Sequence, residues 1–218
     1  MSTLTKIALG FIGRLKPDRV KSRAVAPEMT LPRPEMRGGM PLMEALAKRR
    51  SRREFSSTAL SQQTLSNLLW AAFGINRPES GGRTAPSALD AQEIDLYAAL
   101  PGGLYIYDPR AHSLSLVAPV DARRVTGYQD FVDEAPLDLV YVADQAHMGA
   151  VPAERRSAYS AASAGAIAQN VYLYCASADL SAAVRGWFDH AALTQALRLG
   201  EHEHVVMTQT VGYPRGFV

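Results

Sequence analysis

The chain has 218 residues, of which 47% are hydrophobic and 20% charged, and its formal net charge is +2. This composition excludes a disordered chain and suits one substantial core, and no apolar run reaches the roughly 18 residues of a membrane span. The single cysteine, Cys175, cannot form an internal disulfide, so we expect a small core residue in a cytoplasmic protein.

The first elements predicted along the chain are an arm and a linker. Residues 4–15 place apolar side chains at helical spacing, which predicts a short amphipathic helix. Residues 26–41 contain four prolines and two glycines and should be irregular. We therefore expect an N-terminal arm and linker over residues 1–40 and a folded domain over residues 41–218.

Five helical segments are expected in the folded domain. Residues 42–50 look helical, and residues 61–74 form a stronger helical pattern, with Ser61 as the N-cap and Gly74 at the end. Residues 157–180, rich in Ala, Ser and Gly, predict a long central helix whose backbone can approach a neighbour closely. A further helix should follow Asp189 and stop at Gly200, and residues 121–133 also favour helix.

Strands are expected between these helices. Residues 93–100 alternate in strand fashion, and residues 103–117 read as two strands around a turn at Asp108 and Pro109. Residues 137–144 and 205–213 are apolar runs of strand length. Helices and strands alternate without a regular βαβ rhythm, so the fold class should be α+β.

The basic segment from Lys48 to Arg53 holds five basic residues in six positions. Residues 1–53 have a formal net charge of +9 and the remaining residues −7, so the positive charge is concentrated in the N-terminal part of the sequence. A nucleic-acid surface would spread its basic residues and interleave aromatics, which this segment does not do. Guanidinium forks around a serine hydroxyl suit one compact phosphate dianion. A solvated charged face is the alternative that the segment alone leaves open.

Several stretches resemble a known family in the same order along the chain. They are "RRSRREF", "LSNLLWAAFG", "RTAPSALDAQEIDLYAAL", "YIYDPRAHSL", "EAPLDLVYVAD", "AGAIAQNVYLYCASADL", "VRGWFDHAAL" and "TVGYP". Together they resemble the nitroreductase-like flavoproteins, especially the branch of SagB-type dehydrogenases, over residues 31–214. The resemblance implies a homodimer with FMN at the subunit interface. It also implies a mainly antiparallel central sheet flanked by helices, with a long central helix at that interface.

The resemblance also assigns residues to the cofactor. Arg52 falls at a variable position and should point away, and Arg185 is either a further polar contact or a surface arginine. Arg215 is the candidate near the C-terminus for completing the phosphate site. The cofactor-binding residues implied are Arg49, Arg50, Ser51 and Arg53 for the phosphate, Pro86, Ser87 and Ala88 for the turn beside the flavin, Asp90 and Gln92 for the ring or ribityl chain, and Arg185, Gly186 and Arg215.

Asp90 departs from the family pattern, in which many members carry Asn. A carboxylate near the pyrimidine edge would repel the anionic reduced flavin. Asp90 should therefore turn away, accept a hydrogen bond from the flavin N3–H, or lower the redox potential.

The chemistry implied is hydride transfer from NADH or NADPH through the flavin N5 to a nitroaromatic, quinone or similar small acceptor. Such chemistry requires no protein nucleophile or base, and we identify no catalytic residue. Residues 201–204 offer four possible metal ligands, but consecutive residues rarely converge on one ion, so we expect a polar loop and no metal. The alternatives are a SagB-like azoline dehydrogenase acting on peptides and a flavin-binding protein without turnover.

Overall fold

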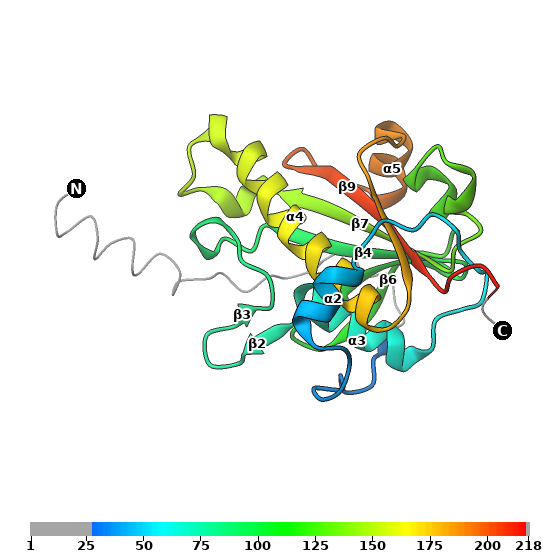
Figure 1. Ribbon diagram of the computed structural model, residues 1–218. Helices are drawn as coiled ribbons and strands as arrows, with labels where there is room; N and C mark the ends of the chain where they lie inside the picture. The colour runs from blue at the N-terminus through cyan, green and yellow to red at the C-terminus, as the bar shows by residue number, and fades with distance from the viewer. Residues whose placement is uncertain (1–27, 217–218) are drawn as a thin grey trace.

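The computed structural model describes residues 28–216, and the predicted helix over residues 4–15 lies outside them. The chain forms a central sheet with helices on both faces (Figure 1). Its elements in order are β1 (Glu28–Thr30), α2 (Leu42–Lys48), α3 (Gln62–Phe73), β2 (Ile75–Arg77), β3 (Gly82–Arg83), η1 (Ala88–Asp90), β4 (Ile94–Leu100), β5 (Gly103–Asp108), β6 (Ser113–Ala118), η2 (Arg123–Thr126), η3 (Asp130–Val132), β7 (Leu137–Asp144), η4 (Gln145–Met148), α4 (Ala153–Ser177), β8 (Ser181–Arg185), α5 (His190–Leu197) and β9 (Glu203–Gly212).

The main sheet has seven strands in the order β1-β6-β5-β4-β7-β9-β8. Every neighbouring pair in it is antiparallel. The central strands β4 and β7 are buried on both faces, although the alternating sequence of β4 predicts a half-buried strand. The α+β class with an antiparallel sheet flanked by helices is thereby confirmed.

The two faces of the sheet bury separate apolar layers. One face packs against α3 and α4, where Leu68 and Ile167 meet Leu96 and Leu139. In Figure 1, α4 crosses in front of the strands with α2 and α3 beside it. The other face is covered by α5 and the loops near it, with Leu193 packed into that layer. The sheet thus holds the long α4 along one face.

Helix α3 begins and ends where the sequence predicts. The Ser61 hydroxyl accepts a hydrogen bond from the Thr64 N–H at 3.0 Å, which caps the first turn. Gly74 ends the helix with φ −68°, so the glycine is not needed for a left-handed residue. A Cβ at Gly74 would lie 2.4 Å from Cδ1 of Trp70, so close packing explains this glycine.

Replacing Ser61 by alanine should remove the cap and lower the free energy of unfolding by about 1 kcal/mol. For a chain of this size the midpoint temperature should fall by about 2–4 °C in thermal unfolding followed by circular dichroism. Ser57→Ala removes a hydroxyl from an exposed serine and serves as the matched control. Equal midpoints for the two variants would show that the Ser61 cap contributes nothing.

Several elements differ from the sequence-based expectations. Strand β1 pairs with β6 and Leu31 is 5% exposed, so the folded part includes residues 28–31 and does not begin near Pro41. The segment 121–133 forms only the short turns η2 and η3. Strand β8 and the β2–β3 hairpin were not predicted, because neither carries a strong strand pattern.

Candidate functional site

The basic segment lies against the C-terminal half of α4 and opens onto a cavity of about 490 Å³. Arg49 and Arg50 line this cavity, and the Arg49 guanidinium lies 5.4 Å from the ring centroid of Tyr172 on α4. Cys175 lines it as well, but burial raises the pKa of its thiol. This confirms Cys175 as a core residue. The groups in the cavity that can bind an anion are therefore the guanidinium groups of the basic segment.

Tyr172 positions the serine of the basic segment. Its phenol oxygen accepts a hydrogen bond from the Val184 N–H at 2.8 Å and lies 2.8 Å from Oγ of Ser51. When the Tyr172 hydroxyl donates to Ser51, the Ser51 hydroxyl proton is left to donate to an anion. No local pattern predicts this contact, because Tyr172 lies 121 residues from Ser51.

Two basic residues of the segment have carboxylate partners of their own. Lys48 pairs with Glu44 at 3.0 Å, and Arg52 pairs with Asp179 at 3.1 Å. Arg52 contributes to the cavity wall, so it does not point away, but Asp179 offsets its charge. Arg49 and Arg50 have no ion pair within the described residues, so they supply the uncompensated charge of the cavity.

Arg53 and Arg215 lie further along the same edge. The segment after Arg53 runs beside the end of the chain, because Phe55 bridges to Pro214. Arg215 pairs with Glu134 at 3.1 Å and lines a separate cavity. Within one chain the structure therefore does not bring Arg215 to the cavity of Arg49 and Arg50.

The turn after Thr84 has a strained backbone. Leu89, Asp90 and Gln92 have φ values of 52°, 54° and 51°, a left-handed region that residues other than glycine seldom adopt. The turn is held by the Gln92 N–H, which donates to Oγ of Ser87 at 2.9 Å. Such outliers persist only where the surroundings enforce them, and they concentrate at functional sites. Asp90 and Leu89 are exposed at its tip.

Gln92 has a structural role that differs from the predicted cofactor contact. Its side chain is buried, and its amide donates to the Gly81 carbonyl at 3.1 Å and to Oδ1 of Asp90 at 3.0 Å. Its amide oxygen accepts from Nε of Arg83 at 3.1 Å. Both amide hydrogens are used within the chain, so Gln92 braces the turn and sets the position of Asp90.

Arg185 also lies elsewhere than predicted. Its guanidinium is buried on the face of α5, 2.7 Å from Oδ1 of Asp138, and it also donates to Thr126 and Thr210. Burial raises the pKa of Asp138 and Arg185 opposes that rise. The alternative of a surface arginine is therefore wrong for Arg185, because its guanidinium is buried in this cluster, and the contact with the cofactor stays a prediction.

Gly186 is exposed and a Cβ at this position would meet nothing within 4 Å. Nothing in the described chain therefore explains a glycine here, and the space around it is open to another molecule. The neighbouring Trp187 is 72% exposed and lies against Tyr128, with 5.3 Å between the ring centroids.

The basic segment and the strained turn lie at opposite ends of β7. The Arg52 N–H donates to the Ala182 carbonyl on β8. Ala182 pairs with Val211 on β9, and Val211 pairs with Leu137 at the start of β7. The turn leads into Ile94, which pairs with Ala143 near the end of β7. Leu137 and Ala143 are about 20 Å apart at roughly 3.3 Å per residue. Within a single chain, the basic segment and the strained turn are therefore too far apart to touch each other.

His112 belongs to a chain of hydrogen bonds in which each donor and acceptor can be assigned. Ser66 donates to the Pro32 carbonyl at 2.5 Å, so its oxygen accepts from Nε2 of His112 at 2.7 Å. Nδ1 of His112 then accepts from the Tyr107 hydroxyl at 2.9 Å. Burial lowers the pKa of His112 and raises that of Tyr107. The neutral histidine is a structural residue.

This shift predicts a pH dependence of stability. In the folded protein the pKa of His112 lies below its ordinary value of 6.5. The contribution of neutral His112 to the free energy of unfolding is therefore fully present above pH 6.5 and is lost as the pH falls toward the folded pKa. Asparagine tolerates the positive φ of 49° and does not titrate, so His112→Asn is the suitable variant. In urea unfolding, the stability difference between wild type and variant should be larger at about pH 7.5 than at about pH 5. A difference that stays constant would contradict the burial effect.

The described residues also bear on the predictions about metal ligands and membrane spans. Among residues 28–216 no three His, Cys, Asp or Glu side chains are grouped as metal ligands; within the predicted 201–204 loop, Glu203 instead accepts from the Gly200 N–H at 2.7 Å. In the same range no helix is both long and apolar enough to cross a bilayer.

Comparisons with known proteins bear on the family and the fold. The model of the Nitroreductase family matches residues 46–213. MJ1384 of Methanocaldococcus jannaschii, named as a candidate nitroreductase, is 30% identical over 76% of this chain and 88% of its own length. A candidate nitroreductase structure from Ralstonia eutropha is 48% identical with a TM-score of 0.83, covering 93% of this chain and all of that one.

A more distant structure shares the fold alone. It is a chain of the Escherichia coli microcin synthetase McbBCD complex, 18% identical with a TM-score of 0.65 over 93% of this chain and 85% of that one. The family match covers well over half of the sequence and includes the basic segment, the strained turn and α4. The chain belongs to the Nitroreductase family.

Proposed function

We propose that this protein is an FMN-dependent oxidoreductase that uses NADH or NADPH to reduce a small acceptor such as a nitroaromatic or a quinone. The observation that carries the proposal is the cavity at Arg49 and Arg50, with the Ser51 hydroxyl beside it. It provides charged forked donors and a neutral hydroxyl donor, the set that a phosphate monoester requires.

The residues present fit the proposed cofactor. Arg49, Arg50, Ser51 and Arg53 would hold the phosphate, and the open space at Gly186 leaves room for a planar ring. The turn at Ser87 would form another wall, with Gln92 fixing its shape. When bound, FMN supplies hydride acceptance and donation at its N5 atom. The chain itself binds, orients and shields that group, and no protein acid or base is needed.

We further propose that two chains build each site. The basic segment and the strained turn lie about 20 Å apart along β7. The strained turn of one chain would therefore complete the cofactor site that begins at the basic segment of the other chain. Helix α2 exposes Leu42 and Met43 by 63% and 76%, an unusual amount for such large apolar side chains. Beside it, α4 exposes Ala161 and Ala162, whose small size permits close approach of a second helix. This surface supports a homodimer.

The proposal is tested by the colour of the purified protein. We expect a flavin spectrum, FMN as the released cofactor, anaerobic bleaching by NADH or NADPH, and return of the colour on adding a nitroaromatic or a quinone. A colourless protein that takes up no FMN would overturn the proposal. A yellow protein that neither nicotinamide bleaches would overturn the assigned electron donor.

A further inference from the structure

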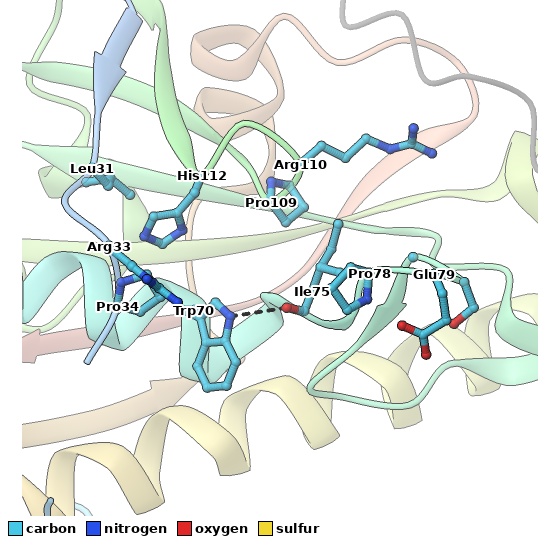
Figure 2. A pocket seen from close by; sticks show the side chains of 12 residues that line it. Leu31, Arg33, Pro34, Trp70, Ile75, Pro78, Glu79, Pro109, Arg110 and His112 are labelled. Atoms are coloured by element: carbon cyan, nitrogen blue, oxygen red, sulfur yellow. Dashed lines mark hydrogen bonds between the residues drawn. The ribbon is translucent and has the colours of Figure 1, made fainter. Parts of the chain in front are cut away.

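A second and larger cavity lies away from the basic segment (Figure 2). Its volume is about 1070 Å³, large enough for a small organic molecule. Four segments build it: residues 31–34, the end of α3, the β2–β3 hairpin and the β5–β6 turn. None of its lining residues lines the cavity of Arg49 and Arg50. It is therefore a separate site.

The walls of this cavity are mainly apolar and include the indole ring of Trp70. Figure 2 shows Trp70 and Pro34 on one side, with Ile75, Pro78 and Pro109 across from them. The Trp70 indole gives the cavity one flat aromatic surface, on which a planar ring system can stack, and the proline rings add apolar contacts around it.

Hydrogen bonds hold the walls in place. The Trp70 indole N–H donates to the Ile75 carbonyl at 3.2 Å, and the Thr84 hydroxyl donates to the Trp70 carbonyl at 3.3 Å. The Gln92 amide fixes the Gly81 carbonyl on the hairpin at 3.1 Å. The cavity is thus formed before any ligand enters, which reduces the entropy lost on binding.

The polar groups at the base of the cavity are already satisfied. Both ring nitrogens of His112 are hydrogen-bonded, one to Ser66 and the other to Tyr107. The indole N–H of Trp70 is used as well. A ligand in the cavity would therefore find no free hydrogen-bonding group on His112 or on the Trp70 indole, and its polar group would need one of the charged side chains that line the cavity.

The charged residues that line the cavity are Arg33, Arg110 and Glu79. In Figure 2 the Arg110 guanidinium extends away from the cavity, whereas Arg33 lies beside Pro34 and Trp70. Arg33 is exposed and lies next to the aromatic wall, where a guanidinium can pair with a carboxylate whose ring rests on the indole. We propose that this cavity binds a planar aromatic carboxylate, with its ring on Trp70 and its carboxylate on Arg33.

Binding at this cavity can be detected by ¹⁹F NMR of the labelled tryptophans. The chain has two, Trp70 and Trp187, so labelling with 5-fluorotryptophan gives two ¹⁹F resonances that Trp187→Phe assigns. The probe is 2-naphthoate, added to the full chain as purified, and its neutral match is 2-naphthylmethanol. Saturation with naphthoate should shift the Trp70 resonance. A Trp70 resonance that stays unchanged at saturation would overturn the site.

Calorimetry then tests the assigned contacts. Arg33→Ala should weaken naphthoate binding by about tenfold or more and leave binding of the neutral alcohol unchanged. Arg37→Ala, which removes an exposed arginine outside the cavity, should change neither affinity. Equal naphthoate affinity in the Arg33 and Arg37 variants would overturn the carboxylate contact. These readouts require no bound flavin and no turnover, so their failure is distinct from a failure of the proposed oxidoreductase.

Discussion

Replacing Arg49 and Arg53 together by alanine should weaken FMN binding by about a hundredfold or more, because each charge-assisted hydrogen bond to a phosphate contributes roughly 1.5–3 kcal/mol. The Arg49 guanidinium lies at the cavity beside Tyr172 and has no carboxylate partner in the described chain. Arg53 is exposed two residues before the Phe55 bridge. The measurement is fluorescence titration of the apoprotein with FMN.

The same segment supplies the control. Arg52→Ala removes one positive charge from the same segment, but Asp179 already offsets that charge at 3.1 Å, so FMN affinity should change by less than about threefold. Sedimentation should show the same assembly for both variants, since neither change touches the exposed apolar side chains of α2. If the Arg49 and Arg53 double variant bound FMN as tightly as the wild type, the phosphate would have to lie elsewhere.

Replacing Asp138 by alanine should lower the free energy of unfolding by about 3–5 kcal/mol, because it leaves the buried Arg185 guanidinium without its counter-charge. The Asp138 side chain is fully buried and that of Arg185 is 4% exposed, so water cannot compensate for the loss. The measurement is chemical denaturation followed by circular dichroism.

Two further variants separate the ion pair from other effects. Asp133→Ala breaks the pair with Arg124, whose side chains are 46% and 57% exposed, and it should cost less than about 1 kcal/mol. Removing both buried charges, with Asp138→Leu and Arg185→Met, should recover most of the loss, since an apolar pair leaves no uncompensated charge. A single Asp138 variant as stable as the wild type would contradict the burial of this pair.

The sequence predicted the elements whose signals are local. Helix α3 has a serine cap, an apolar stripe and a terminal glycine within 14 residues, and the structure places its ends there. Strand β8 has no such signal, because "SAAVR" is short and dominated by small residues. It becomes a strand through pairing with β9, a contact that no local pattern encodes.

The site was predictable only in part for the same reason. The spacing of the arginines and Ser51 predicts an anion site, but Tyr172 and Asp179, which contact Ser51 and Arg52, lie more than 120 residues away. The burial of Arg185 could not be predicted for a related reason, because the groups around it are also distant in sequence, with Asp138 lying 47 residues away. Sequence spacing thus indicated the chemistry of the basic segment, whereas burial determined which side chains remain available.

The central claim, that one flavin is held by two chains, is tested by the FMN content of mixed dimers. One chain carries Arg49→Ala and Arg53→Ala, the other carries Ala88→Glu in the strained turn, and different affinity tags isolate the mixed dimer. Each parent dimer should lack FMN. The mixed dimer should hold about one FMN, because one of its two symmetric sites combines an intact basic segment with an intact turn. A mixed dimer without FMN would show that both parts of the site come from the same chain.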